Sequence, residues 1–565
     1  MIKMNRIEIT QKRIILLGVF LTIFVIGTTL IFITPIGIKA TYNQTVQTTD
    51  GVAISFNVFE PEAGGMNKKA IILGHGVMSN KEMLKGYAIE FATAGFVAVP
   101  FDFRGHGQST GDHRTGSLIN DIIAIVSYLN SRPDIDTTNL GYLGYSMGGI
   151  GIQLVNQSTD FKCFIGAGTW LPTNIRKGNS TSPLNILMML GRYDELLTPE
   201  DLKIGLSNYT GIPEADLDVN KLYGSFQDGN ASMIYLDDLS NHVLGNWDPD
   251  WIRVARNFLG STFPDVRPVD ENFVTNTRLF ILCLQLFGGF GLFVLIIDPL
   301  SKLILKIQDE EFFKLDLNNN SAINLGGKTV AFSLILGLPG ILIFVPVLLL
   351  LFLAVAGFIT ALLFGQAFAI LILLWRIGKK RNIGLKEMIK KPFKTSRNDI
   401  LRQFLLGAIL AIILTIIIYV SGGLNYLGMI PSLVKVPWVP LFLIINFIIF
   451  MIYGLLFHGV FQNKFEKGFK PLVKVSFGIF GFTFLYWFTY LFIFSLIMRS
   501  FFYFGNFIPF AIPLFLMNGF LSTLIYQKSG NIIAGAIVNT LFFTLMICTI
   551  SPYQSGLSFI LGFLH

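Results

Sequence analysis

The chain has 565 residues, of which 52% are hydrophobic and only 14% are charged, a composition that excludes a single soluble domain. Its formal net charge of +8 does not indicate nucleic-acid binding, because the basic residues lie mostly beside apolar segments, where they orient a membrane protein. The three cysteines, Cys163, Cys283 and Cys548, are scattered, so they predict neither a disulfide framework nor a cysteine-based metal site.

A basic segment and a long uncharged segment come first along the chain. Residues 1–13 carry Lys and Arg side chains, and residues 14–34 hold no charge over the length that a bilayer requires. So long an apolar run favours an uncleaved membrane anchor over a cleaved signal peptide. We therefore expect residues 1–40 to form a cytoplasmic N-terminus and an anchor helix.

Residues 41–262 have a different character, with charges throughout and short apolar runs that Gly, Pro, Asn and Asp interrupt. Strand signals alternate with helix signals. The predicted strands are 68–76, 139–145, 160–168 and 183–194, with a strand followed by a loop at 95–107, and the predicted helices between them include 81–95 and 117–132. This alternation predicts a mostly parallel sheet with helices on both faces, whose chemistry gathers at the carboxyl ends of the strands.

The segment GYSMG, residues 144–148, follows a predicted strand and precedes a helix-compatible stretch. A serine at a sharp strand-to-helix turn needs small neighbours, because the backbone there is crowded and strained. Gly144 and Gly148 meet that need on either side of Ser146. The context predicts that Ser146 is a nucleophile at such an elbow rather than an ordinary turn serine.

A serine hydroxyl becomes a useful nucleophile only when a base takes its proton and a carboxylate orients that base. In folds with this elbow the chain order is serine, acid, histidine, so His242 is the predicted base. The acid should follow the preceding strand, as Asp194 does directly. The other candidate carboxylates, in order of decreasing preference, are Glu195 and then Asp237 or Asp238.

Five motifs together make residues 68–262 resemble an α/β-hydrolase, of the serine-hydrolase group that includes monoacylglycerol-lipase-like esterases and serine peptidases. The motifs are LGHG (73–76), FDFRGHGQSTG (101–111), GYSMGG (144–149), GRYDELLTP (191–199) and NH (241–242). The resemblance implies that the backbone N–H groups of Val77 and Met147 form an oxyanion hole. His75 and His106 are expected to order loops. We expect neither a metal nor a cofactor.

The segment departs from many α/β-hydrolases in lacking a large cap. Only residues 170–184 separate the strand that ends near Thr169 from the next one, whereas the stretch between Asp194 and His242 is long and contains a turn-rich loop at 223–232. We hypothesise an open site that is covered, if at all, by that loop or by the membrane domain.

The chain is apolar again from Leu279 onward. The expected spans lie near 279–297, 329–350, 352–375, 404–421, 438–457, 475–497, 507–526 and 531–550, which makes nine with the anchor. Residues 263–278 are then a linker and 279–565 an all-α polytopic membrane domain. With the N-terminus inside, the outer loops of this domain hold only Lys435 and Arg499 as basic residues. This bias predicts an integral protein of the cell membrane with its hydrolase domain outside.

Residues 452–468 and 519–543 resemble the core helices of the CAAX-processing and bacteriocin-processing (CPBP) intramembrane endopeptidases. The family's paired glutamates, arginine, histidine and asparagine are replaced here, in that order, by Tyr453 and Gly454, His458, Asn539 and Phe543. No catalytic carboxylate remains, so protease activity is not expected in this half.

Several polar side chains nevertheless lie in the apolar segments. They are Gln366, Asn446, His458, Asn518 and Asn539. Hydrogen bonds between helices are the favoured interpretation, and a lipid or peptide pocket is the alternative. On that alternative, the membrane domain would hold a hydrophobic substrate for the hydrolase domain.

The resemblance implies a membrane-anchored serine hydrolase that cleaves carboxylic esters, lipid or acylglycerol esters among them, through an acyl-Ser146 intermediate. The same residues would serve a membrane-bound serine peptidase. A protein of another class, a transporter or scaffold with a non-catalytic hydrolase fold, is the remaining alternative. The expected partners are an ester, lipid or peptide substrate and membrane lipids, without nucleic acid, and the sequence does not indicate an oligomeric state.

Overall fold

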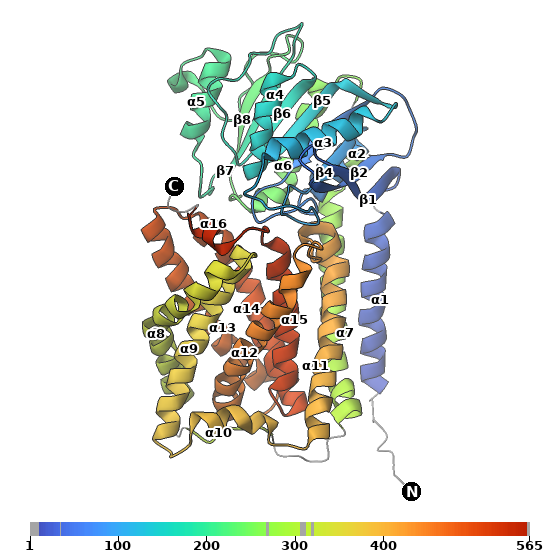
Figure 1. Cartoon of the computed structure of the whole chain (residues 1–565). Helices are drawn as coiled ribbons and strands as arrows, with labels where there is room; N and C mark the ends of the chain where they lie inside the picture. Colours follow the sequence, from blue (N-terminus) through green and yellow to red (C-terminus); the bar gives the residue numbers. More distant parts are fainter. Residues whose placement is uncertain (1–10, 34, 267–269, 306–311, 318–320, 562–565) are drawn as a thin grey trace.

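The computed structural model describes all residues except 1–10, 34, 267–269, 306–311, 318–320 and 562–565. A domain built on a β-sheet sits on one end of a bundle of long helices (Figure 1). Residues 1–10 of the predicted cytoplasmic segment and 267–269 of the predicted linker lie outside the described residues.

The sheet has eight strands in the order β1-β2-β4-β3-β5-β6-β7-β8. The strands are β1 (Ile38–Gln47), β2 (Ala53–Pro61), β3 (Lys68–Gly74), β4 (Val97–Phe101), β5 (Ile135–Tyr145), β6 (Phe161–Ala167), β7 (Asn185–Gly191) and β8 (Ser232–Asp237). The pairs from β4 through β8 are parallel, whereas β1 pairs with β2 and β2 with β4 in antiparallel fashion. The prediction of a mostly parallel sheet is confirmed.

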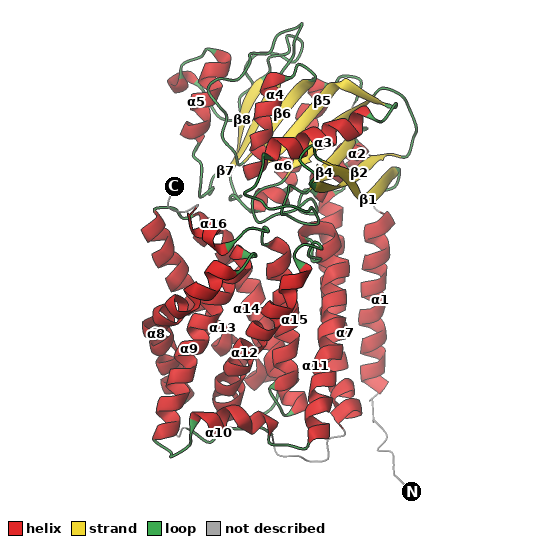
Figure 2. Cartoon of the chain, viewed as in Figure 1, coloured by secondary structure: helices red, strands yellow, loops and turns green. Residues whose placement is uncertain are grey.

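Helices cover both faces of the sheet (Figure 2). They are α2 (Lys85–Thr93), α3 (Leu118–Asn130), α4 (Ile152–Gln157), α5 (Pro199–Thr210) and α6 (Pro249–Thr262). Helices α3, α4 and α5 bury apolar side chains against one face, and α2 and α6 against the other. Alternate residues of β3 serve the two cores, with Ala70 and Ile72 on one side and Ile71 and Leu73 on the other. Successive side chains of a strand point to opposite faces, and here both faces are buried. The sequence of a central strand is therefore a continuous apolar run.

Two local features differ from the sequence-based expectation. The hairpin of β1 and β2 was not predicted, because β1 is a largely exposed edge strand without a clear alternation of apolar residues. Helix α2 begins at Lys85 instead of residue 81. The backbone N–H of Lys81 donates to Asp102 Oδ1 at 2.7 Å, so this residue belongs to a buried turn before the helix.

Nine helices among the described residues are long and apolar enough to span a membrane, the number expected from the sequence. They are α1 (Gln11–Ile33), α7 (Thr275–Leu305), α8 (Ala322–Leu350), α9 (Ala354–Lys379), α11 (Arg397–Ile418), α12 (Val439–Leu456), α13 (Phe469–Met498), α14 (Phe502–Ser529) and α15 (Ile533–Ile550). Two short helices, α10 (Leu385–Lys390) and α16 (Gly556–Leu561), accompany them. This helical region supports insertion of the protein into a membrane.

A π-helical segment, Tyr419–Leu427, continues α11 and meets the sheet domain. Its carbonyl oxygens accept hydrogen bonds from three side chains of that domain. The donors are Asn80 Nδ2 to Leu427 O at 2.7 Å, Lys85 Nζ to Leu424 O at 2.9 Å, and Trp247 Nε1 to Tyr426 O at 3.2 Å. Because carbonyls at a helix end lack partners within the helix, these bonds satisfy them and fix the sheet domain on the bundle.

Candidate active site

Ser146 lies directly after β5, at the start of a short 3₁₀ turn over Ser146–Gly151. Its φ of 50° is in the left-handed region, which costs free energy for a residue with a side chain and marks a strained turn. A Cβ on Gly144 would lie 2.5 Å from Gly148 O, and a Cβ on Gly148 would lie 2.0 Å from Gly74 O. The two glycines flanking the serine are therefore required by backbone crowding.

His242 connects Ser146 with Asp194. The imidazole Nε2 is 2.9 Å from Ser146 Oγ, and Nδ1 is 2.8 Å from Asp194 Oδ2. The second carboxylate oxygen of Asp194 accepts hydrogen bonds from the backbone N–H groups of Leu196, at 2.9 Å, and Leu197, at 3.1 Å. These bonds and the burial of both side chains hold the carboxylate and the imidazole in one orientation. The structure thus brings together three residues that are 48 and 96 positions apart in sequence.

The other candidate carboxylates have hydrogen-bond or ion-pair partners of their own. Glu195 instead accepts hydrogen bonds from Asn241 Nδ2 at 3.0 Å and from the backbone N–H of His242 at 3.3 Å. Burial raises the pKa of Glu195 above its ordinary value. Asp237 accepts the backbone N–H groups of its own turn, and Asp238 forms an exposed ion pair with Arg192. Glu195 therefore holds the loop that carries the histidine.

Two residues beside His242 were missed by sequence reasoning. Gly168, just after β6, has a φ of 56°, and a Cβ there would lie 3.1 Å from His242 Cε1 and Nδ1. The phenol of Tyr145 donates a hydrogen bond to the backbone carbonyl of His242. The glycine makes room for the ring, and the tyrosine holds the loop that carries it. In the sequence, the only signal for Gly168 was its position at the end of a predicted strand.

His75 and His106 stabilise loops next to the site, as expected. The Nδ1–H of His75 donates to Gly76 O at 2.7 Å, and its Nε2 accepts the backbone N–H of Phe103 at 3.1 Å. Burial lowers the pKa of His75 to about 4, so the ring is neutral at physiological pH. His106 lies beside it, with ring centroids 5.0 Å apart.

The loop FDFRGHGQS is built around a second buried group, the carboxylate of Asp102. It forms an ion pair with Lys81 at 2.6 Å and accepts the backbone N–H of Gln108 at 2.9 Å. A Cβ on Gly107 would lie 2.2 Å from this carboxylate, so the glycine is needed for the close approach. Burial alone would raise the pKa of Asp102, but Lys81 and the hydrogen bonds lower it. The motif therefore orders a loop.

The segment after β3 runs close to the serine. A Cβ on Gly76 would lie 3.1 Å from Ser146 Cβ, and Gly76 and Val77 line the same cavity as Ser146. Met147 follows the serine in the tight turn. The predicted oxyanion-hole residues, Val77 and Met147, thus belong to segments that meet at Ser146, and their role stays a prediction.

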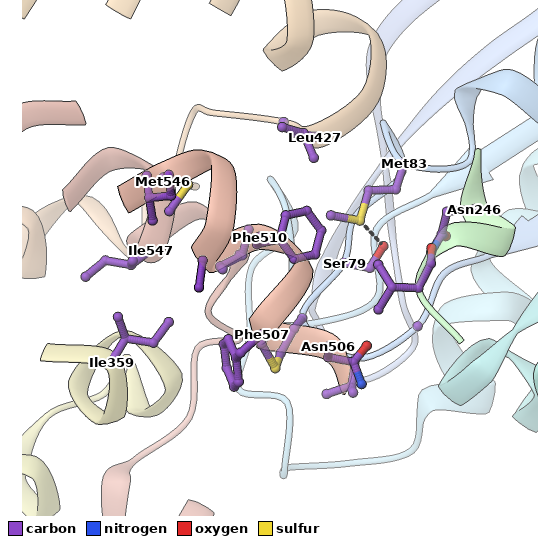
Figure 3. Close-up of a pocket in the computed structure, with 18 of the residues that line it drawn as sticks. Ser79, Met83, Asn246, Ile359, Leu427, Asn506, Phe507, Phe510, Met546 and Ile547 are labelled. Atoms are coloured by element: carbon purple, nitrogen blue, oxygen red, sulfur yellow. Dashed lines mark hydrogen bonds between the residues drawn. The ribbon is translucent and has the colours of Figure 1, made fainter. Parts of the chain in front are cut away.

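Ser146 and His242 open into a cavity between the sheet domain and the helical region, which we call the junction chamber. Its cavity volume is about 150 Å³. Figure 3 shows Ser79, Met83 and Asn246 on one side and residues of α9, α14 and α15, among them Ile359, Phe510 and Met546, on the other. No residue of the turn-rich loop 223–232 lines it. Of the two covers hypothesised from the sequence, the helical region is the one that lies over the serine.

The polar side chains in the apolar helices hydrogen-bond between segments. Asn446 Nδ2 donates to Thr544 Oγ1 at 2.9 Å, Asn539 Nδ2 to Asn518 Oδ1 at 3.0 Å, and Tyr453 Oη to Gln366 Oε1 at 2.9 Å. His458 differs, because its Nδ1 is 2.6 Å from Oε1 of Gln462 in the same helical segment, and its ring stacks on Tyr526. The three pairs between helices agree with the favoured interpretation of helix-to-helix hydrogen bonds.

One group of acidic side chains in the described part of the chain has the spacing of metal ligands. The carboxylate oxygens of Asp237, Asp248 and Asp250 lie within 4.8 Å of one another. Asp248 is also the N-cap of α6, and its Oδ1 accepts the backbone N–H of Asp250 at 2.8 Å. The cluster therefore has a structural role at the helix start, and none of its residues contacts Ser146 or lines the junction chamber.

Comparison with known proteins places the similarity in the sheet domain. Residues 65–196 match the family model described as serine aminopeptidase, S33. An Escherichia coli protein named "Uncharacterized 31.7 kDa protein in traX-finO intergenic region" is 25% identical over 200 residues, which are 33% of this chain and 68% of that protein. The polyketide transferase claH of Penicillium crustosum is 28% identical over 106 residues, 18% of this chain and 34% of its own.

Among solved structures, the Pyrococcus furiosus esterase Pf2001 is 19% identical, with a TM-score of 0.31, over 39% of this chain and 92% of the esterase. The resemblance of the helical region to CPBP endopeptidases has no counterpart in the family match, which ends at residue 196, and stays a prediction. The family match and the sheet topology together identify an α/β-hydrolase fold joined to a helical region, and they support a hydrolase of the serine type.

Proposed function

We propose that this protein is a membrane-bound serine hydrolase that cleaves carboxylic esters through an acyl-Ser146 intermediate. The observation that carries the proposal is the hydrogen-bonded chain from Ser146 Oγ through His242 to Asp194, with distances of 2.9 and 2.8 Å. A serine in a strained turn, a base within hydrogen-bond reach and a carboxylate behind that base are the parts that nucleophilic acyl transfer requires.

In the first half-reaction, Ser146 Oγ attacks the ester carbonyl carbon while His242 Nε2 takes the hydroxyl proton. Asp194 accepts the Nδ1–H, keeps the imidazole in the required tautomer and stabilises the imidazolium. The negative charge on the carbonyl oxygen is stabilised by the backbone N–H groups of Val77 and Met147. Collapse of the tetrahedral intermediate breaks the ester C–O bond, and His242 returns the proton to the departing alcohol.

In the second half-reaction, His242 removes a proton from a water molecule, which attacks the acyl-Ser146 carbonyl. The tetrahedral intermediate breaks at the Ser146 Oγ–carbon bond, and the serine regains its proton from His242. The products are the acid and the alcohol, and the enzyme returns to its starting state. Every proton moves through residues of this chain or through water.

The same proposal places the protein in the cell membrane with the sheet domain outside. α1 and the other long helices support an integral protein. At the bundle end opposite the sheet domain (Figure 1), Asp298 pairs with Arg13, with Lys528 at 3.2 Å and with Lys302 at 3.3 Å. Positive charge concentrated at one end of a bundle favours a cytoplasmic location for that end. Domain limits at residues 40, 262 and 278 are part of this proposal.

Labelling with a fluorophosphonate probe tests the catalytic role of Ser146. We expect purified full-length protein to be labelled and the variants Ser146→Ala and His242→Ala to lose the label. Ser131→Ala, an exposed serine at the end of α3, is the matched control and should label like wild type. A folded wild type that stays unlabelled would contradict the proposal.

A serine peptidase is the second candidate, because the matching family model is described as a serine aminopeptidase. The same three residues would cleave an amide. Hydrolysis of aminoacyl p-nitroanilides with a higher kcat/KM than p-nitrophenyl esters would favour this candidate. A transporter or scaffold would be favoured instead if Ser146→Ala kept the full biological activity.

A further inference from the structure

The position of Ser146 relative to the helices raises the question of what the helical region contributes to the reaction. The junction chamber begins at Gly76, Val77, Ser146 and His242 and continues between α9, α13, α14 and α15. The nucleophile thus faces the interior of the bundle. A substrate carbonyl placed at Ser146 therefore has an adjoining space between membrane helices.

The walls of that space are almost entirely apolar. The lining side chains from the helices are Ile, Leu, Met, Phe and Ala types, with Trp487 and Asn506 as exceptions. A polar group that entered such a space would lose its hydrogen bonds to water, at a cost of about 1–3 kcal/mol for each group left unpaired. A hydrocarbon chain loses nothing comparable. The chamber therefore selects for an apolar part of the substrate.

The lining of the chamber extends along several helices. From Ser146 and His242 it continues to Ile359 of α9, Phe510 of α14 and Met546 of α15. If the enzyme were selective for small esters, the helices would take no part in substrate binding. A long acyl chain, in contrast, can pack against α14 and α15 while its carbonyl stays at Ser146.

The acyl side of the ester is the part that suits this space. During catalysis the acyl group stays bound to Ser146 through both half-reactions, whereas the alcohol must leave after the first so that water can take its place. A chamber that extends from Ser146 into the bundle favours the group that remains. The polar side chains Ser79 and Asn246 lie on the opposite side of the chamber, in the sheet domain (Figure 3).

We propose that the membrane helices form the acyl-chain site of the hydrolase, so that its substrates are esters of long-chain acids. This inference rests on the proposed function, since it needs an acyl group on Ser146. The helical region is then half of the active site as well as an anchor. The large cap that the sequence lacks is replaced by α9, α13, α14 and α15.

Neighbouring residues of α14 provide a matched test. Ala511 is buried and lines the chamber, whereas Ile512 is 38% exposed on the outer surface of the bundle. Ala511→Trp should narrow the chamber, and Ile512→Trp adds a similar bulk outside it. Both variants would be measured as full-length protein in the same detergent with p-nitrophenyl acetate and p-nitrophenyl decanoate. Ratios of variant to wild type on one substrate cancel the partition of that ester into detergent.

We expect Ala511→Trp to lower kcat/KM for the decanoate at least tenfold and to change the acetate value by less than about twofold. This follows because each methylene withdrawn from an apolar site costs about fourfold in binding. Ile512→Trp should change neither value by more than about twofold. Equal losses on both esters in Ala511→Trp would overturn the inference.

A second variant keeps the test valid if Ala511→Trp does not fold. Met546 lines the chamber from α15, and Met546→Ala should widen it and move the preferred acyl chain to a longer one. An unchanged chain-length preference would also overturn the inference. Failure of the proposed function is distinguishable, because wild type would then cleave neither ester and its Ser146 would not react with a fluorophosphonate.

Discussion

The hydrolase domain and the helical region treat their buried polar groups differently. In the hydrolase domain one set forms a chain directed at a single atom, as Asp194 and His242 are directed at Ser146 Oγ. In the helical region several form pairs between segments, such as Tyr453 with Gln366. Such a pair satisfies hydrogen bonds and positions helices, whereas a chain that ends at a hydroxyl can move a proton. On the function that we propose, bond cleavage belongs to the hydrolase domain and substrate binding to the helical region.

The junction chamber shows how the two regions depend on each other. Its polar end belongs to loops of the hydrolase domain, and its apolar walls belong to membrane helices. Glu195 lies at the boundary, because its carboxylate holds the His242 loop and occupies the space beside Gly505 of α14, where a Cβ would lie 2.0 Å from Oε1. A shift of α14 would therefore move Glu195 and, with it, the loop that carries His242.

The largest loss of kcat is expected from Asp194→Asn, in the hydrolase domain. The amide would present a donor to His242 Nδ1 and favour the wrong tautomer, a change that lowers kcat about 10⁴-fold in a serine protease triad. We expect a loss of about 10³- to 10⁴-fold in kcat on p-nitrophenyl esters. Asp238→Asn, at an exposed aspartate paired with Arg192, is the control and should stay within about twofold. Similar activity in the two variants would remove Asp194 from the mechanism.

A smaller effect is expected at the boundary between the regions. Glu195→Ala removes the acceptor of Asn241 and of the His242 backbone, and a lost hydrogen bond of about 1–1.5 kcal/mol corresponds to roughly a tenfold lower kcat. Glu195→Gln keeps one of the two acceptor oxygens and should lose less kcat than Glu195→Ala. If the two variants lose kcat equally, the carboxylate charge rather than the hydrogen bonds is what matters.

Acid should weaken the hydrolase domain. The Arg104 guanidinium holds the pKa of Asp50 well below its ordinary range, and Arg132 does the same for Asp134. Because these folded-state pKa values lie below the unfolded value of about 3.9, the two pairs stabilise the fold above pH 4 and lose that contribution as pH falls further. Thermal unfolding followed by near-UV circular dichroism should show a Tm that declines below pH 4. A Tm that stayed constant down to pH 3 would contradict this.

The smallest effect on catalysis is expected from His458→Ala. This histidine hydrogen-bonds Gln462 and stacks on Tyr526, with no contact to the junction chamber. Hydrolysis of a short ester should stay within about twofold of wild type, although the lost packing should lower the Tm. A tenfold loss in kcat by a variant with native Tm would show that the helical region takes part in the chemistry.

The sequence alone determined the parts of this protein that depend on local pattern. Alternating strand and helix signals predicted the parallel sheet, and long uncharged runs predicted nine spanning helices, because hydrophobic periodicity and length are read within one segment. The glycines around Ser146 predicted the elbow, since a strained turn admits few residue types. The chain order of the elbow fold then selected His242 and favoured Asp194.

The tertiary structure decided what depends on contacts between distant segments. The sequence only ranked Asp194 above Glu195, and the distance of 2.8 Å from Asp194 Oδ2 to His242 Nδ1 came from the structure. The role of Gly168 needed the approach of the histidine ring from another loop. The chamber needed helices separated from Ser146 by more than two hundred residues to close over it. Hydropathy records how apolar a helix is, but it carries no information on which of its faces meets a cavity. Only the packing of the helices against the hydrolase domain could reveal that Ser146 faces the bundle interior.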